Sequence, residues 1–257
     1  AEAFWPRAIE EVRRQVPDFT FMAEVYWDLE WALQQQGFGY TYDKRLYDRL
    51  RGLQARPVRE HLQAGLDFQA KLARFLENHD EPRAAAAFPP EVHRAAAVVS
   101  FLTPGLRFFH RGQFEGHKTR IPVQLRRGPC EASDPELYDF YDRLLALLRE
   151  PILRSGDWRL LDCVPAWDGN PSWDSFIAFA WREPAGRCWV IPVNYADQRS
   201  QCYIPLPVEQ LGGSEWLLRD LMGSVSYDRD GYQLLSPGLY LDTPAWGYHV
   251  FQLTKCE

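Results

Sequence analysis

Strand-forming runs and helical patterns alternate four times along residues 1–154, and this alternation constrains the fold more than any other feature of the sequence. The expected strands lie at 19–27, 38–43, 72–78 and 106–110. The expected helices lie at 1–15, 28–36, 57–71, 91–102 and 133–150. Repeated strand-helix units form a parallel sheet that is covered by its helices. The sequence therefore predicts an α/β domain over residues 1–154.

The helix expected at 133–150 has the clearest pattern of these segments. Ser133 and Glu136 have the spacing of a capping box, which predicts that the helix begins at Ser133. One apolar face repeats at helical spacing and consists of Leu137, Phe140, Tyr141, Leu144, Leu145 and Leu148. This face is expected to pack on the core of the α/β domain.

The pattern changes after Pro151, where helical signals become rare and short strand-forming runs take their place. The expected strands lie at 158–164, 175–182, 187–194, 201–206, 215–221, 238–243 and 247–253. Turn-forming pairs such as Gly212-Gly213 and Asp230-Gly231 separate them. Short strands at this spacing are typical of an antiparallel β-sandwich. We therefore expect a second domain over 155–257.

Composition and charge limit the kind of partner that the chain can bind. The chain is 46% hydrophobic and 25% charged, with a net charge of -6. Because there is no basic stripe, binding to nucleic acid or to an anionic membrane is not expected. No apolar run has the length of a membrane-spanning helix. A neutral or polar small molecule is the expected ligand.

The cysteines and histidines do not form a metal-binding pattern. Five cysteines are widely spaced and none belongs to a C-x-x-C pair, namely Cys130, Cys163, Cys188, Cys202 and Cys256. This pattern argues against a zinc site or a disulfide framework, so no metal or cofactor is predicted. Reduced thiols favour the cytoplasm, although the sequence leaves the compartment unknown and a bridge between Cys188 and Cys202 open.

Polar side chains follow two of the expected strands at the point where each strand ends. Glu24 follows the apolar run Phe21-Met22-Ala23, and Asn78, His79 and Asp80 follow another. Parallel βα architectures place their chemistry at these strand ends. Two carboxyl groups on either side of a glycosidic bond are the usual means of cleaving it. Each of these residues also has a structural explanation when it is considered alone. Glu24 fits the role of a helix-cap residue, and His79 fits that of a structural hydrogen-bond partner of an acid.

Three stretches resemble conserved motifs of the α-amylase superfamily of glycoside hydrolases. F-L-E-N-H-D, at 75–80, resembles the fourth motif, in which strand seven of the barrel ends in Asn-His-Asp. F-M-A-E-V-Y, at 21–26, resembles the third, where strand five carries the acid/base glutamate. P-G-L-R-F-F-H-R-G-Q-F-E-G, at 104–116, is similar to the region of the eighth strand. The resemblance implies strands 5–8 of a TIM (β/α)8 barrel over 1–154 and a β-sandwich over 155–257.

The resemblance also implies a role for each residue of the matched motifs. Glu24 corresponds to the general acid/base of the family. Asp80 corresponds to the carboxylate that hydrogen-bonds sugar hydroxyls and stabilises the transition state, and His79 is expected to contact the same sugar. Asn78 is given a supporting role in substrate binding, and Tyr26 is a candidate platform for a sugar ring. The implied activity is that of a retaining α-glycoside hydrolase acting on α-glucans or α-glucosides.

Four charged residues near these motifs are interpreted separately. Asp28 and Glu30 are read as first-turn charges of the following helix rather than as catalytic groups. Glu77 is a candidate for lining the site, and its role stays open. Arg83 either pairs with a site carboxylate or lies in a solvated loop.

Two earlier motifs of the family have no counterpart in this sequence. They are an Asp-His pair on strand three and a G-x-R-x-D segment on strand four that supplies the nucleophilic aspartate. We therefore expect this chain to be the C-terminal portion of a longer enzyme, to require the N-terminal half of the barrel and to be inactive alone. The calcium that family members often bind belongs to the same missing part.

Two alternatives to hydrolysis remain at this point. The first is an α-glucanotransferase, since transfer and hydrolysis differ in how the pocket treats water and an acceptor. The second is a non-catalytic remnant that binds carbohydrate or a protein partner. The presence of Glu24 together with the whole Asn78-His79-Asp80 set favours the enzyme, because a binding remnant has no chemical need for the acid.

Overall fold

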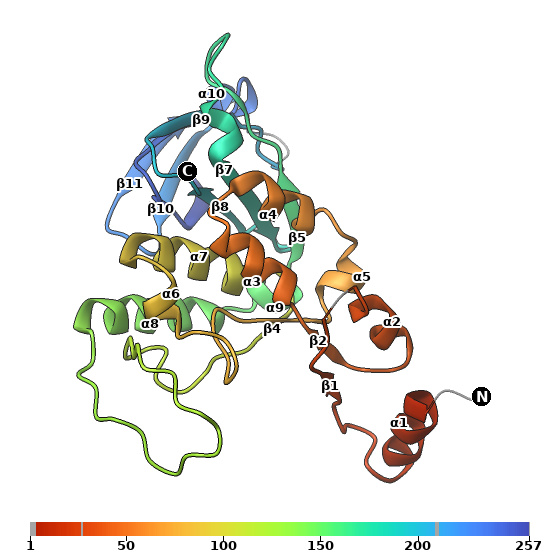
Figure 1. Cartoon of the computed structure of the whole chain (residues 1–257). Coiled ribbons are helices and arrows are strands. Elements are labelled where there is room, and N and C mark those ends of the chain that lie inside the picture. The colour runs from red at the N-terminus through yellow and green to blue at the C-terminus, as the bar shows by residue number, and fades with distance from the viewer. Residues whose placement is uncertain (1–3, 27, 209–210, 257) are drawn as a thin grey trace.

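The computed structural model describes residues 4–26, 28–208 and 211–256 (Figure 1). Its strands form three sheets: a parallel sheet of four strands and two antiparallel sheets of six and three strands. No described helix is both long and apolar enough to cross a membrane. The fold is thus mixed α/β in the first part of the chain and rich in antiparallel strands in the second.

The parallel sheet has the strand order β1-β2-β3-β4. Its strands are β1 (Met22–Ala23), β2 (Tyr40–Tyr42), β3 (Leu72–Arg74) and β4 (Leu106–Arg107), and each lies inside an expected strand. Pairing is parallel throughout, with Ala23 opposite Thr41 and Ala73 opposite Leu106. Within the described residues β1 and β4 remain edge strands, so the sheet does not close into a barrel.

Helices precede, connect and follow these four strands. They are α1 (Phe4–Gln15), α2 (Glu30–Gln35), α3 (Lys44–Arg51), α4 (Ala55–Leu62), α5 (Leu66–Gln69), α6 (Ala84–Ala87), α7 (Pro90–Leu102), α8 (Pro135–Leu148) and α9 (Ile152–Ser155). The helix expected over 57–71 is two helices, α4 and α5, with Gly65 as the residue before α5. Helix α3 was not expected, because most of its residues are polar, and it buries only Leu46, Tyr47 and Leu50.

The start of α8 corrects the capping-box prediction. The N-cap is Asp134 rather than Ser133, and its carboxylate accepts a 3.1 Å hydrogen bond from the Leu137 amide. Pro135 occupies the first helical position, where its fixed φ favours helix entry, so the cap falls on the residue before it. Glu136 forms an ion pair with Arg94 instead of a reciprocal cap bond.

Two antiparallel sheets make up the second part of the chain. The larger has the order β11-β10-β13-β8-β7-β5 and the smaller has the order β12-β9-β6. Their strands are β5 (Asp157–Leu161), β6 (Val164–Pro165), β7 (Phe176–Arg182), β8 (Cys188–Asn194), β9 (Ser200–Ile204), β10 (Glu215–Asp220), β11 (Ser226–Asp230), β12 (Leu239–Thr243) and β13 (Phe251–Lys255). Strand β11 was not expected because most of its residues are polar. It lies at one edge of the larger sheet. Cys188 and Cys202 are both free thiols.

The central strands β7 and β8 are buried on both faces. Phe179 and Trp181 point into the core that the helices share, whereas Ala178 and Ala180 point into the core between the two antiparallel sheets. The alternation follows from the two-residue period of a strand. Trp181 also donates a 2.7 Å hydrogen bond to the Leu102 carbonyl at the end of α7. The α/β part and the antiparallel sheets therefore share one continuous core.

Candidate active site

Two strand ends of the parallel sheet bring the predicted polar residues to one edge. Glu24 directly follows β1, and Asn78, His79 and Asp80 lie on the loop that leaves β3. Phe75 and Leu76 are buried and anchor the start of that loop. Since β1 and β3 both pair in parallel with β2, their carboxyl ends face the same side of the sheet.

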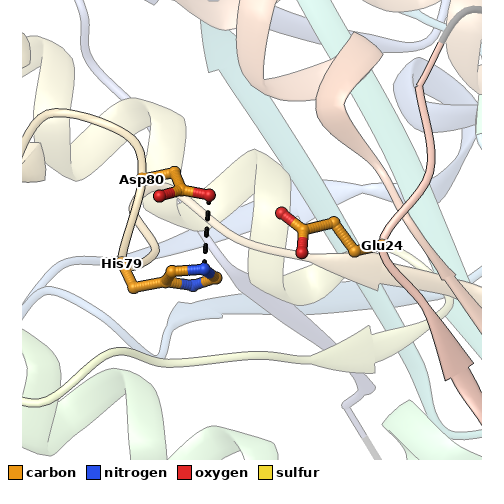
Figure 2. A group of neighbouring side chains, drawn as sticks. All are labelled: Glu24, His79 and Asp80. Atoms are coloured by element: carbon orange, nitrogen blue, oxygen red, sulfur yellow. Dashed lines mark ion pairs between the residues drawn. The ribbon is translucent and has the colours of Figure 1, made fainter. Parts of the chain in front are cut away.

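Glu24, His79 and Asp80 converge at this edge. One carboxylate oxygen of Glu24, one ring nitrogen of His79 and one carboxylate oxygen of Asp80 all lie within 4.8 Å of one another. Figure 2 shows the Glu24 side chain pointing across the gap at the two residues of the β3 loop. His79 Nε2 is 3.2 Å from Asp80 Oδ2. The three groups could hold a cation, or they could bind the hydroxyl groups of a ligand.

Charge and exposure leave this group open to a ligand. Glu24 and Asp80 are exposed, and the His79 side chain is 38% exposed. Arg120 lies 3.8 Å from the second oxygen of Asp80 and is itself more than half exposed. Lys44 pairs with the neighbouring Glu81 at 3.3 Å. The carboxylates of Glu24 and Asp80 therefore face solvent, with Arg120 beside Asp80 and Lys44 beside the next residue, Glu81.

Tyr26 contacts Glu24 directly. Its hydroxyl donates a 2.8 Å hydrogen bond to Oε1 of Glu24. Burial and this hydrogen bond both raise the pKa of Tyr26, so the hydroxyl stays protonated and remains a donor. The residue predicted as a sugar platform thus holds one oxygen of the predicted acid/base.

Asn78 fixes the turn that presents His79 and Asp80. Its Oδ1 accepts hydrogen bonds from the backbone amides of Asp80 at 2.9 Å and Glu81 at 2.8 Å. The side chain is 1% exposed, and its Nδ2 has no hydrogen-bond partner among the described residues. An asparagine suits this position because its short amide reaches the backbone two and three residues ahead.

A buried ion pair lies beneath the same loop. Glu77 is fully buried and lies 2.9 Å from Arg83, which is 4% exposed. Glu77 also accepts a 2.7 Å hydrogen bond from the Ala84 amide and lies 3.3 Å from Nδ1 of His110, on the loop after β4. Arg83 donates to the Arg111 carbonyl. The cluster therefore ties the loop that carries Asp80 to the loop that follows β4.

Burial governs the ionisation of this cluster. It raises the pKa of Glu77 to about 7, although the Ala84 amide and Arg83 act in the opposite direction. Burial, together with the charge of Arg83, lowers the pKa of His110. His110 is consequently neutral near pH 7, where Glu77 is in mid-titration.

Comparison with known proteins identifies the fold. No protein-family model matches the sequence, and no curated protein sequence matches it either. An α-amylase from Anoxybacillus has 20% identity and a TM-score of 0.73, with 98% of this chain and 56% of that chain covered. An α-amylase from Geobacillus thermoleovorans, solved with acarbose, has 20% identity and a TM-score of 0.75, with 98% and 57% covered. A debranching enzyme from Nostoc punctiforme has 16% identity and a TM-score of 0.66, with 97% and 54% covered.

The chain has the fold of the C-terminal part of an α-amylase. The resemblance inferred from the motifs at 21–26 and 75–80 is confirmed at this level. The chain spans 56% of the length of the Anoxybacillus α-amylase and 57% of that from Geobacillus. The fold match agrees with the four-stranded parallel sheet and the antiparallel sheets that follow it.

Within this α-amylase fold, sequence reasoning missed the pairing of Glu77 with Arg83 and His110. The sequence left both Glu77 and Arg83 open, and the structure pairs them with each other rather than with Glu24 or Asp80. One signal was available: two opposite charges six residues apart on either side of a strand-end motif. Their burial follows from the path of two loops in space, which local sequence does not encode.

Proposed function

We propose that this chain supplies the acid/base and the transition-state-stabilising carboxylate of a retaining α-glycoside hydrolase that acts on α-glucans or α-glucosides. The observation that carries the proposal is the convergence of Glu24, His79 and Asp80 within 4.8 Å at the carboxyl edge of a parallel sheet. Support comes from neighbours that are α-amylases and debranching enzymes, one of them complexed with acarbose and another soaked with it.

In the proposed mechanism Glu24 protonates the glycosidic oxygen as the bond breaks. Tyr26 holds Oε1 of Glu24, which leaves the other oxygen to carry the proton. Asp80 and His79 bind hydroxyls of the sugar whose anomeric carbon becomes positive, and the Asp80 charge stabilises that carbon. A nucleophile from outside this chain bonds to the anomeric carbon as the glycosidic bond breaks, and Glu24 then takes a proton from the water that displaces this nucleophile and releases the sugar.

The proposal also includes a division of the site between two half-barrels. Among the described residues the converging group contains two carboxylates, whereas retention requires a nucleophile as well. We assign the four parallel strands to the second half of a (β/α)8 barrel and place the nucleophile on strands outside this chain. The open edge of β1, beside Glu24, is where those strands would pair.

Sugar release tests the proposal. The 257-residue chain is expected to release no reducing sugar from soluble starch. A longer polypeptide, in which a half-barrel with a G-x-R-x-D segment precedes this chain, is expected to be active. Glu24→Gln and Asp80→Asn should each lower its kcat by at least ~100-fold. Glu91→Gln, at an exposed position of α7, is the matched control. Unchanged kcat in Glu24→Gln would refute the assignment.

A second candidate, a non-catalytic carbohydrate-binding role, is favoured by one observation. The converging group holds two carboxylates and no third among the described residues. In that case the longer polypeptide would bind maltotriose without releasing sugar, and Glu24→Gln would leave its affinity unchanged.

A further inference from the structure

A cavity lies where the parallel sheet meets the larger antiparallel sheet, at the amino end of β4. It has a volume of about 360 Å³, and its walls come from α5, β4, α9, β5 and β7 and from the residues next to them. Pro104 and Gly105, which directly precede β4, form part of the wall. Glu24 and Asp80 lie beyond the carboxyl ends of β1 and β3, so the cavity is at the opposite end of the parallel sheet.

Two arginines of the wall, Arg107 of β4 and Arg154 of α9, have no acidic partner. Among the described residues no carboxylate lies within ion-pair distance of either guanidinium group. Asp157 also lines the cavity, but its side chain is exposed and pairs with neither arginine. The wall therefore carries two positive charges against one negative charge.

Arg107 is held in place and keeps donors for a ligand. Its Nε donates a 3.1 Å hydrogen bond to the Phe101 carbonyl at the end of α7. Its Nη1 donates to the Gly105 carbonyl at 3.0 Å, and its Nη2 donates to the Leu153 carbonyl at 3.2 Å. A guanidinium group has five N–H donors, so one N–H on each Nη atom is left over. The three bonds to carbonyls fix the direction of these remaining donors.

Repulsion between the two arginines makes the cavity favourable for an anion. Burial, together with the charge of Arg154, lowers the pKa of Arg107 to about 10, so Arg107 still carries its charge near pH 7. Two like charges beside one partly buried cavity repel each other more than they would in water. An anion between them would turn this repulsion into attraction.

Trp158 adds a donor without an acceptor to the same wall. The residue is 7% exposed, and its indole Nε1 has no hydrogen-bond partner among the described residues. Trp181, opposite Trp158 on β7, differs because it donates to the Leu102 carbonyl. Since buried donors are nearly always paired, the wall around Trp158 is rich in donors and short of acceptors.

These features favour a phosphate group over other classes of ligand. The two arginines repel cations, and a neutral ligand gains nothing from their charge. A guanidinium fork binds two oxygens of an anion at once, and a phosphate group has enough oxygens for two such forks whereas a carboxylate does not. A cavity of about 360 Å³ is also larger than a phosphate group, which leaves room for a small organic substituent.

We propose that this cavity binds a phosphate group, free or carried by a small organic ester, between the guanidinium groups of Arg107 and Arg154. The site goes beyond the hydrolytic function proposed above, because none of Glu24, His79 and Asp80 lines it. Since Arg107 belongs to β4 and Arg154 to the helix that leads into β5, the ligand ties the parallel sheet to the larger antiparallel sheet.

Isothermal titration calorimetry of the 257-residue chain tests the site, with inorganic phosphate and glucose 6-phosphate as separate ligands and sodium chloride at matched ionic strength. The chain is expected to bind both, and Arg154→Gln should weaken each affinity at least ~10-fold, the loss expected for a charge-assisted hydrogen bond. Arg154 is exposed and its side chain forms no hydrogen bond with a described residue, so this variant should fold. Arg159→Gln, at an exposed position of β5 outside the cavity, is the matched control and should retain the affinity.

The unfolding midpoint separates loss of the site from loss of the fold. Without phosphate, Arg154→Gln should unfold at or slightly above the wild-type temperature, because the substitution removes one of two like charges. Phosphate should raise the midpoint of wild type and Arg159→Gln but not that of Arg154→Gln.

Two results would overturn the phosphate site. One is that the wild-type chain binds neither ligand, and the other is that wild type and Arg154→Gln have equal affinity. Binding of inorganic phosphate alone would assign the free anion as the ligand. Hydrolysis is measured separately, by sugar release from the longer polypeptide, so failure of the phosphate site leaves that proposal standing.

Discussion

The Tyr26 hydroxyl donates a 2.8 Å hydrogen bond to Oε1 of Glu24, two residues before it in the chain. Residues two apart in an extended segment point to the same side, so the chain that leaves β1 places the phenol and the carboxylate on one face. The hydrogen bond fixes the direction of the carboxylate that we propose as the acid/base.

Replacement of Tyr26 by Phe tests this positioning. The variant keeps the ring but loses the donor, so Glu24 should sample more than one orientation. We expect kcat of the longer polypeptide to fall roughly 10-fold, the effect of about 1.4 kcal/mol. The unfolding midpoint should change little, because Tyr26 is only partly buried. An unchanged kcat would show that the hydrogen bond has no part in orienting the acid.

Replacement of Asn78 by Ala should loosen the turn that carries His79 and Asp80. The substitution removes the acceptor of two backbone amides at a position that is 1% exposed. We expect a loss of about 2 kcal/mol in the free energy of unfolding and faster hydrogen exchange at the Asp80 and Glu81 amides. Asn78→Asp keeps an acceptor oxygen and should retain the slow exchange. Equal exchange rates in wild type and Asn78→Ala would contradict the role of Asn78.

Glu77 should make stability depend on pH. Burial raises the pKa of Glu77 from 4.5 to about 7, so the folded chain binds a proton in this window that the unfolded chain has released. The free energy of unfolding should therefore be highest below pH ~4.5 and fall by about 3 kcal/mol as the pH rises to ~7. Urea unfolding at a series of pH values measures this slope.

Glu77→Gln is the variant that isolates this titration. It should flatten the slope between these pH values, whereas Glu91→Gln, at an exposed site of α7, should retain it. The same slope in wild type and Glu77→Gln would assign the pH dependence to other groups.

Arg83→Met should destabilise the chain by about 3 kcal/mol, because it leaves a buried carboxylate without its ion-pair partner.

Much of the fold was predictable, because apolar periodicity is a local property. The four parallel strands lie within the expected runs, and the antiparallel strands β7, β8 and β10 lie within one residue of theirs. Helix α3 and strand β11 were missed, since their side chains are mostly polar and their backbone pairing is decided by tertiary contacts. The N-cap of α8 was misjudged by one residue because Pro135 was not used as the first helical position.

The candidate site was predictable only in part. Glu24, His79 and Asp80 stood out because polar residues at the ends of apolar strands are conspicuous in sequence. The hydrogen bond from Tyr26 and the capping of the turn by Asn78 follow from backbone direction, which the residue pattern does not specify. The burial of Glu30 was not foreseen, since a first-turn glutamate of a helix normally faces solvent, whereas here the residue is only 5% exposed.

The central claim is that Glu24 donates the proton and Asp80 stabilises the sugar cation at one site. Turnover of α-maltosyl fluoride and of soluble starch by the longer polypeptide tests it most directly, since fluoride leaves without protonation whereas a sugar alcohol does not. Glu24→Gln should lose ~100-fold or more on starch and much less on the fluoride, while Asp80→Asn should lose both. Equal losses on the two substrates in Glu24→Gln, or full starch turnover in that variant, would contradict the account.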